Sequence, residues 1–422
     1  MHIFYTGYNL SQGGKQVILH ARSSDRPGTA FTKPLEPVTI HGDRSQFEDI
    51  DFRDAHVSWN EPEKCYWMLV ATRLKQGPFW TRGFLALLTS PDLEAWTIDP
   101  EPFYAPNDMF CPECPEIFSL PNGKWYLVYS RFHAPNAGTV YRVADSPRGP
   151  FRVPHGASGG RFDARRWYAA KSCEKAGDSS KRIYFGWIAD KLEGQWSWGG
   201  DMGIPREVSA DGDGNLVVQP CKEFLDARFH SADEEEISRT LNISAIGQTV
   251  TEFLPATSPD YCLRLNLRSQ DAAAYGLAFR TDTDMAGHRL KFVPITSTLA
   301  EVTLFKAPPP LDDFWADQYD LHLHREVDGP ELARHVVGMR SSVTVTVHSD
   351  VLEIFCGGKS ISHRLEPPAA SKRESTHANG NGHSNGMTNG VSNKTGPRLD
   401  REIGVFVEDG SLELENISLR PR

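Results

Sequence analysis

Short apolar runs that alternate with polar residues recur along this chain of 422 residues, and the alternation is cleanest after residue 225. Residues 263–267 read Leu-Arg-Leu-Asn-Leu, and residues 343–347 read Val-Thr-Val-Thr-Val. A period of two places the apolar side chains on one face of a strand and the polar ones on the other. Because several such segments follow one another, we expect an antiparallel sheet with one buried face, closed as a β-sandwich.

The first half of the chain carries aromatic strand cores at a regular spacing. Tyr5, Trp67, Tyr126 and Phe185 lie in these cores, and successive members are 62, 59 and 59 residues apart. A period near 60 residues, built only of strands and turns, is typical of the blades of a β-propeller. Nine of the ten Trp residues precede residue 200, which indicates a boundary near residue 225.

These patterns predict an all-β chain with two domains: a β-propeller over residues 1–224 and a β-sandwich over residues 225–422. Residues 367–397 contain no aromatic residue, Leu or Ile, and their centre is rich in Asn, Gly, Ser and His. Such a segment cannot bury enough apolar surface to offset its ordering entropy. We therefore predict a disordered insertion there, between two strands of the sandwich.

Composition narrows the range of functions. The net charge of -10 and the pI of about 5.8 give no large basic surface, so nucleic acid is not an expected partner. No run of 18 apolar residues exists, so no membrane-spanning helix is expected. The first residues lack the basic and apolar pattern of a signal peptide and resemble the middle of a strand. This start fits either a cytosolic protein or a chain whose true beginning lies elsewhere.

The seven cysteines are scattered and odd in number, which argues against a disulfide framework. Cys111 and Cys114 form a C-x-x-C pair, but zinc would require a second pair and none exists. Neither a metal nor another cofactor is therefore predicted.

Two segments contain carboxylates that could carry chemistry. Arg53 and Asp54 are adjacent, and they could place a cation and a carboxylate at the inner edge of a blade; the alternative is a surface turn with a salt bridge. Glu113 lies between prolines and cysteines, which restrict the backbone. A rigid, partly apolar setting of this kind suits a general acid. The alternative is a solvated loop, and Glu116 competes with Glu113 for the role.

A third segment, residues 196–207, brings Trp198 close to other aromatic and glycine residues. A flat apolar platform of this kind can stack against a sugar ring. Ordinary aromatic core packing is the alternative, because aromatic residues dominate protein cores in general.

Taken together and in this order, these segments resemble glycoside hydrolase family 32, the β-fructofuranosidases. Phe52-Arg53-Asp54 is similar to the F-R-D-P motif of the family, and Glu113-Cys114-Pro115 is similar to its E-C-P motif. Further similarity to family signatures lies at residues 167–171, 185–188, 202–207, 351–355 and 404–410.

The resemblance implies a five-bladed propeller followed by a sandwich, and retaining hydrolysis of terminal β-D-fructofuranosides in the central funnel. The implied substrates are sucrose, fructo-oligosaccharides or fructans of the inulin or levan type. By this resemblance Glu113 is the acid/base and Asp54 is the transition-state stabiliser, and no cofactor is needed. The implied substrate-binding residues are Arg53, Cys114, Tyr168 and Trp198. Members of the family are often secreted, so the resemblance favours an extracellular location.

The sequence departs from the family at its start. The family nucleophile is an Asp in an N-D-P-N segment, and no such segment occurs in these 422 residues. We therefore expect the first propeller blade, with the nucleophile, to be missing from this chain. A chain without its nucleophile would be a catalytically inactive fructan-binding protein, which is one alternative to a fructosidase. The other is a related propeller glycosidase acting on arabinosides or xylosides.

Overall fold

The computed structural model describes ten stretches of the chain: residues 1–25, 28–133, 137–155, 159–192, 195–229, 235–237, 240–256, 258–308, 331–365 and 401–422. The regular secondary structure of the described part is almost all strand, with one short helix, α1 (Lys222–Arg228), and one 3-10 turn, η1 (Leu10–Gln12). None of its helices is long and apolar enough to cross a membrane. The predicted insertion at 367–397 lies outside the described residues.

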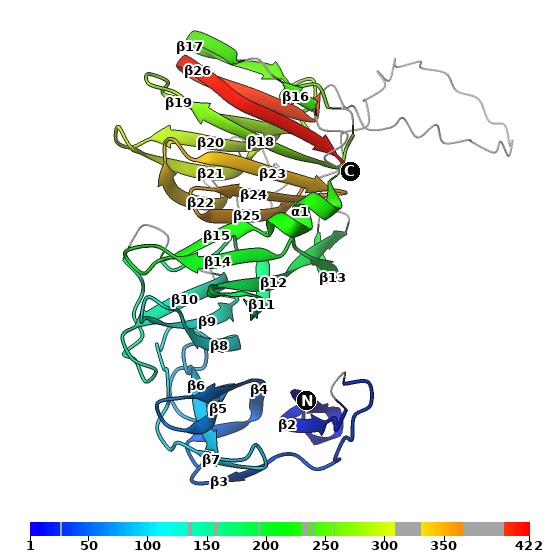
Figure 1. The fold of residues 1–422 in the computed structure, drawn as a ribbon, viewed down its shortest axis with the longest axis vertical. Helices are drawn as coiled ribbons and strands as arrows, with labels where there is room; N and C mark the ends of the chain where they lie inside the picture. The colour runs from blue at the N-terminus through cyan, green and yellow to red at the C-terminus, as the bar shows by residue number, and fades with distance from the viewer. Residues whose placement is uncertain are drawn as a thin grey trace, which may run out of the picture. The chain divides into compact units, whose positions relative to one another are not determined.

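The chain divides into two compact units. The first contains Met1–Ala227 and Glu353–His363, and the second contains Arg228–Leu352 and Arg364–Arg422. The domain limits of 1–224 and 225–422 stay a prediction. Within the described residues 1–220, four separate sheets follow one another along the chain (Figure 1).

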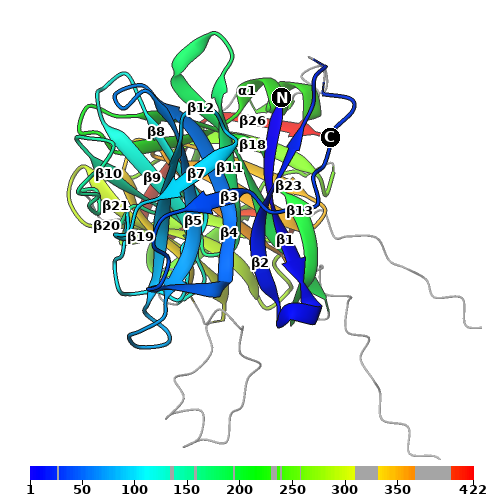
Figure 2. The same cartoon turned by 90° about the horizontal axis from the view of Figure 1, so that it is seen from below.

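The first sheet of the first unit pairs β1 (His2–Asn9) with β2 (Lys15–Arg22). The second sheet has the order β3 (Thr39–His41), β7 (Ala95–Ile98), β6 (Gly83–Ser90), β5 (Cys65–Leu74) and β4 (Phe47–Asn60). Figure 2 shows these two sheets in blue and cyan.

The third sheet has the order β10 (Gly138–Ala144), β9 (Trp125–Arg131) and β8 (Glu113–Ser119). The fourth has the order β11 (Trp167–Lys175), β12 (Asp178–Leu192), β14 (Arg206–Ala210) and β15 (Leu216–Pro220). In addition, β13 (Gln195–Met202) pairs with β12.

The aromatic repeat marks equivalent strands. Tyr5, Trp67, Tyr126 and Phe185 lie in β1, β5, β9 and β12, so the strands predicted at these positions are confirmed. In the second, third and fourth sheets, this strand directly follows the strand that carries a candidate site residue. The period of about 60 residues is therefore the length of one sheet with its connections.

The second sheet is buried on both faces, which explains the unbroken apolar run in β5. Along β5, Trp67 and Leu69 pack into a cluster that includes Leu127 of the third sheet. The alternate residues Met68 and Val70 pack into another cluster that includes Ile18 of the first sheet. Because alternate side chains of a strand point to opposite faces, consecutive sheets stack on one another as propeller blades do.

The second unit is organised around the long strand β26 (Ile403–Pro421), drawn in red in Figure 1. It pairs with β16 (Glu235–Ile237), β17 (Leu241–Phe253), β18 (Tyr261–Arg268) and β19 (Ala274–Phe279). From β19 the sheet continues through β20 (Gly287–Pro294), β21 (Leu299–Ala307) and β22 (Glu331–Gly338). On the other side, β18 pairs with β23 (Ser342–His348).

The alternation expected in this half is confirmed, because Leu263, Leu265 and Leu267 are all buried. Within β26, Asp409 and Gly410 have φ angles of 44° and 126°. The part of β26 before this point pairs with β19, and the part after it pairs with β18. A single strand, β26, thus pairs with β19 through its first part and with β18 through its second part.

The hairpin of β24 (Val351–Cys356) and β25 (Lys359–Arg364) contributes residues to the first unit, where a buried ion network holds them. Arg206 Nη1 lies 2.7 Å from Glu353 Oε1, and Arg206 Nη2 lies 2.9 Å from Asp163 Oδ2. Nη2 also donates to Ser362 Oγ at 2.6 Å. The guanidinium is completely buried, so these carboxylates balance its charge.

Candidate active site

Three strands of neighbouring sheets in the first unit are interrupted by a β-bulge at the candidate site residues. The register shifts after Arg53 in β4, after Glu113 in β8 and after Tyr168 in β11. In each case the next residue has a positive φ angle that non-glycine residues rarely adopt. These residues are Asp54 (61°), Cys114 (50°) and Ala169 (52°).

The amide groups at the three bulges donate to side chains of the preceding sheet or of the neighbouring strand. Asp54 N donates to Thr6 Oγ1 at 3.1 Å, and Cys114 N donates to Asp54 Oδ2 at 3.0 Å. Ala169 N donates to Ser130 Oγ at 3.0 Å. Each bond satisfies a backbone group that the bulge removes from the strand ladder. Backbone strain held in this way is common at functional sites.

The segment around Asp54 therefore lies within a strand, β4, which runs from Phe47 to Asn60. The alternative of a surface turn was wrong, because both residues lie inside this strand. A bulge redirects side chains without ending the strand, and its sequence here contains no glycine or proline that would announce it. Glu113 likewise lies at the start of β8, which rules out the alternative of a loop.

The Glu113 carboxylate is held at both oxygens, yet 23% of its side chain stays exposed. Arg53 Nη2 donates to Oε1 at 2.8 Å, and the Tyr168 hydroxyl donates to Oε2. Burial raises the pKa of Tyr168, and the negative charge of Glu113 raises it further. Tyr168 is therefore protonated over the physiological pH range and serves as a donor to the carboxylate.

Asp54 is the second carboxylate of the cluster. Its Oδ2 lies 3.7 Å from Arg53 Nε and accepts the amide of Cys114. In the part of the chain that the structure describes, Oδ1 has no hydrogen-bond partner, and about a quarter of the side chain is exposed. Asp54 can thus accept hydrogen bonds from a hydroxylated ligand.

Arg53 connects these groups to a third carboxylate. Its Nη1 donates to Asp51 Oδ1, and Asp51 Oδ2 lies 3.2 Å from Nη1 of Arg73. Sequence reasoning did not single out Asp51. The signal was present, because Asp51 and Arg53 are two residues apart in one strand and so share a face.

Glu116, the competitor of Glu113, is committed elsewhere. It is buried, and it accepts the amide and the hydroxyl of Ser172. Arg182 Nη2 also donates to its Oε1 at 2.8 Å. Because Glu116 is buried and both of its oxygens are bonded inside the protein, it is not accessible to a ligand.

Of the other two predicted binding residues, the structure describes the side chain of Cys114 but not that of Trp198. Cys114 lies between Glu113 and Pro115, and burial together with the charge of Asp54 raises the pKa of its thiol to about 12. Its sulfur is thus a neutral thiol at physiological pH and no nucleophile. Trp198 lies in β13, but its side chain is outside the part that the structure describes. The predicted sugar platform at this residue stays a prediction.

The structure thus brings Arg53, Asp54, Glu113, Cys114 and Tyr168 together in one partly exposed cluster. Among the described residues, no group of three or more His, Cys, Asp or Glu side chains could hold a metal ion.

Comparison with known proteins gives related sequences and folds. The chain is 28% identical over 252 residues to an insoluble β-fructofuranosidase isoenzyme of Arabidopsis thaliana, covering 54% of this chain and 42% of that protein. It is 27% identical over 264 residues to fructan 1-exohydrolase w2 of Triticum aestivum, covering 56% and 42%. The matched region therefore spans less than half the length of these relatives.

Solved structures support the fold class. Fructan 1-exohydrolase IIa of Cichorium intybus matches all of this chain and 81% of its own, with a TM-score of 0.66 at 14% identity. A variant of that enzyme in complex with 1-kestose gives a TM-score of 0.64 at 13% identity, with the same coverage. The predicted all-β architecture of a β-propeller followed by a β-sandwich is confirmed.

The sequence model of the glycosyl hydrolases family 32 N-terminal domain matches residues 1–220, which contain every residue of the cluster around Glu113. The match covers more than half of the chain, and the expected motifs lie in it in the expected order. The chain therefore belongs to glycosyl hydrolase family 32.

Proposed function

We propose that this chain is a glycoside hydrolase that acts on terminal β-D-fructofuranosides of the sucrose, inulin or levan type by the retaining mechanism. The observation that carries the proposal is the Glu113 carboxylate, partly exposed and held between Arg53 and Tyr168 beside Asp54. The names of the relatives, a β-fructofuranosidase and a fructan exohydrolase, support the same substrate class.

The two donors at Glu113 determine which oxygen carries the proton of the acid form. A guanidinium has only donors, so Oε1, which faces Arg53, must remain an acceptor. A phenol can either donate or accept, so Tyr168 can turn its hydroxyl when Oε2 becomes protonated. We therefore assign the transferable proton to Oε2. Its transfer to the leaving-group oxygen is general acid catalysis, and its return from water is general base catalysis.

Asp54 supplies the charge that the transition state needs. Oδ1 is open to ligand, and a carboxylate accepts hydrogen bonds from sugar hydroxyls that strengthen as positive charge develops on the ring. The bond from Cys114 N fixes the other oxygen, so the carboxylate is oriented before substrate binds.

Retaining hydrolysis also needs a nucleophilic carboxylate about 5 Å from the acid/base. The N-D-P-N aspartate of the family does not occur in this sequence. Binding of fructans without their hydrolysis is the second candidate function, for a protein in which no other segment supplies this aspartate.

Fructose release from sucrose, 1-kestose and inulin tests the proposal. In a protein supplied with the N-D-P-N aspartate, Glu113→Gln should lower the rate by at least about 100-fold, because general acid catalysis contributes 10²–10⁴-fold. Glu116→Gln is the matched control and should retain turnover, since Glu116 faces Ser172 and Arg182. Near-normal turnover by Glu113→Gln would overturn the assignment.

Two further measurements separate the alternatives. Fructosides with good leaving groups need little protonation, so they should restore turnover in Glu113→Gln and not in Asp54→Asn. Calorimetric binding of 1-kestose without fructose release, unchanged by Glu113→Gln, would favour the binding protein. Release of arabinose or xylose in place of fructose from a panel of glycosides would favour the related propeller glycosidase.

A further inference from the structure

Three large aromatic side chains are exposed next to one another on the first unit. Phe79 and Trp80 lie in the loop between β5 and β6, and Phe132 follows β9. Their exposed fractions are 52%, 60% and 44%. Together with Phe110, which precedes β8, and His133, they form a group that we name the rim cluster.

The rim cluster is contiguous. The ring centroids of Phe79 and Trp80 are 5.0 Å apart, and both rings lie 5.4 Å from the ring of Phe110. Phe132 lies 5.8 Å from Phe110, and Trp80 also contacts His133. A single exposed aromatic residue needs no explanation, but a contiguous exposed patch marks a binding surface.

A buried arginine holds the cluster in place. The guanidinium carbon of Arg73 lies 4.4 Å from the ring centroid of Phe79 and 3.8 Å from that of Phe110. Its Nη2 also donates to the carbonyl oxygen of Phe79 at 2.7 Å. Cation–π contacts and this hydrogen bond fix the loop, so its aromatic faces are presented without an ordering cost at binding.

The same arginine connects the rim cluster to the carboxylate site. Arg73 Nη1 lies 3.2 Å from Asp51, Asp51 binds Arg53, and Arg53 binds Glu113. Phe110 also precedes Glu113 by only three residues, so their Cα atoms are at most about 11 Å apart. Phe110, which contacts the three exposed rings, therefore lies near the acid/base, within reach of a short oligosaccharide.

We propose that the rim cluster is an aromatic platform for the sugar units beyond the terminal fructosyl unit, and that it makes this site selective for fructo-oligosaccharides and fructans over sucrose. The inference rests on the proposed function. Aromatic faces stack against the C–H faces of sugar rings, while ion pairs at the edge, such as Arg82 with Glu48 and Arg131 with Asp108, offer partners to hydroxyls.

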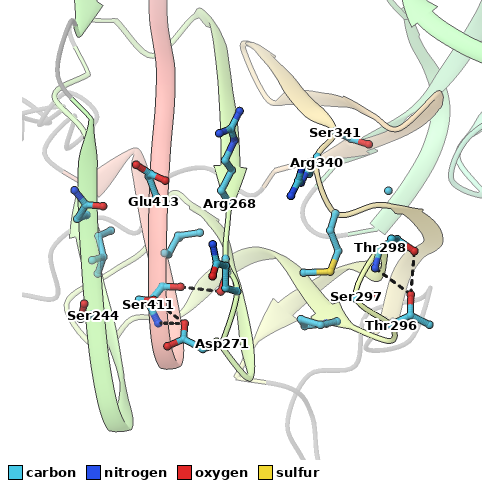
Figure 3. Close-up of a pocket in the computed structure, with 18 residues that line it drawn as sticks. Ser244, Arg268, Asp271, Thr296, Ser297, Thr298, Arg340, Ser341, Ser411 and Glu413 are labelled. Carbon is cyan, nitrogen blue, oxygen red and sulfur yellow. Dashed lines mark hydrogen bonds between the residues drawn. The ribbon is translucent and has the colours of Figure 1, made fainter.

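A second place in the molecule could hold a sugar chain by hydrogen bonds alone. A cavity of about 1430 Å³ in the second unit is lined mainly by hydroxyl, amide and charged side chains (Figure 3). Within the described part of the chain, the side chains of Arg340 and Glu413 at this cavity have no ionic or hydrogen-bond partner. None of the lining residues is aromatic, so this cavity has no stacking face and provides a control.

Calorimetry on the full chain, in the Glu113→Gln background to prevent turnover, tests the platform with fructose, 1-kestose and an inulin-type pentasaccharide. The affinity should rise with chain length. Trp80→Ala should weaken pentasaccharide binding roughly tenfold and leave fructose binding unchanged, and Trp80→Phe should retain most of the affinity. Trp59→Ala is the matched control, because Trp59 is similarly exposed (47%) at the opposite end of β4.

The outcomes separate this inference from the function on which it rests. If 1-kestose binds but Trp80→Ala leaves the preference for longer chains intact, the platform is overturned. Loss of that preference in Arg340→Ala instead would assign it to the cavity of the second unit. If wild type and variants bind neither fructose nor 1-kestose, the proposed function itself fails. Unchanged thermal unfolding of Trp80→Ala would confirm that the variant is folded.

Discussion

Two arginines of the first unit each join carboxylates from different segments of the chain, and they differ in burial and in the hydrogen bonds that their partners make. Arg206 joins Asp163 to Glu353 and is completely buried. Arg53 joins Asp51 to Glu113, with 13% of its side chain exposed. The chemistry of the charged groups is the same in both places, so charge alone does not distinguish a structural network from a site.

The difference lies in how much hydrogen-bonding capacity each network leaves unused. Asp163 Oδ1 accepts the amides of Ala164 and Ser362, and Oδ2 accepts the hydroxyls of Ser360 and Ser362 in addition to Arg206. All these donors are internal. At Arg53, by contrast, the neighbouring Asp54 keeps one oxygen open to solvent. A reactive site is therefore recognised by exposed acceptors that the fold orients but does not satisfy.

Removal of Arg206 should produce the largest effect on stability. Arg206→Ala leaves Asp163 and Glu353 buried without a counter-charge, and losing one partner of a buried ion pair costs about 3–5 kcal/mol. Urea unfolding followed by tryptophan fluorescence measures this loss. Arg422→Ala, at an exposed ion pair, is the control and should change the free energy of unfolding by less than about 1 kcal/mol. A comparably small loss in Arg206→Ala would refute the structural role of the network.

Replacement of Arg53 by alanine should instead affect activity more than stability. Arg53→Ala should cost less stability than Arg206→Ala, about 1–3 kcal/mol, because Glu113 and Asp54 keep some contact with solvent and Asp51 keeps its contact with Arg73. Fructose release should nevertheless fall about 100-fold, since Glu113 loses the donor that orients Oε1. Arg53→Lys should recover only part of the rate, because an ammonium group cannot reproduce the planar set of N–H donors of a guanidinium. If Arg53→Ala destabilised the protein as much as Arg206→Ala, the contrast between the networks would disappear.

Much of the fold could be predicted from the sequence, because buried strand faces produce recognisable patterns of apolar residues. Trp67 and Tyr126 mark equivalent strands of successive sheets, and these sheets are covered on both faces, so their apolar runs stand out. In the second unit one face is buried, so Leu263 and Leu265 alternate with polar residues. Both patterns follow directly from which faces are in contact with water.

The geometry of the site was not accessible in the same way. In a regular strand, Arg53 and Asp54 would point to opposite faces, and only the bulge brings Arg53 to Glu113 and Asp54 to the adjacent Cys114. Glycine is the usual sequence signal for the positive φ angle of such a bulge, yet Asp54, Cys114 and Ala169 occupy these positions. The local sequence therefore did not indicate the bulges that position the site residues.

His56, in the same strand as Arg53 and Asp54, should make the stability of the protein fall in acid. Burial lowers the pKa of His56 well below its ordinary value, and the neighbouring Lys171 lowers it further. An unfolded histidine titrates near pH 6.5, so below that pH the unfolded chain binds a proton that the folded chain does not. The contribution of His56 to the free energy of unfolding is thus fully present above about pH 6.5. Below pH 6.5 this contribution falls by up to about 1.4 kcal/mol per pH unit.

His56→Gln isolates this contribution, because it removes the titrating ring and keeps a donor for the carbonyl of Ile117. The thermal midpoint of the variant should fall less than that of the wild type between pH 6.5 and 5. Burial also lowers the pKa of His20, but His20 is present in both proteins and its effect cancels. Parallel curves for the two proteins would show that His56 is not the group responsible.

The smallest expected effect concerns the strain at the bulges. Ala169 has a φ of 52°, which costs an alanine about 1–2 kcal/mol and a glycine almost nothing. Glycine also loses more backbone entropy on folding, by roughly 0.5–1 kcal/mol, so Ala169→Gly should raise the free energy of unfolding by about 0.5–1 kcal/mol. The adjacent Ala170 has no positive φ and is buried, so Ala170→Gly should destabilise instead. Opposite signs at two neighbouring alanines, measured by urea unfolding, would show that the fold imposes this turn against the preference of its own sequence. The same sign at both would mean that the bulge stores no strain, and that the fixed positions of Tyr168 and Glu113 have another origin.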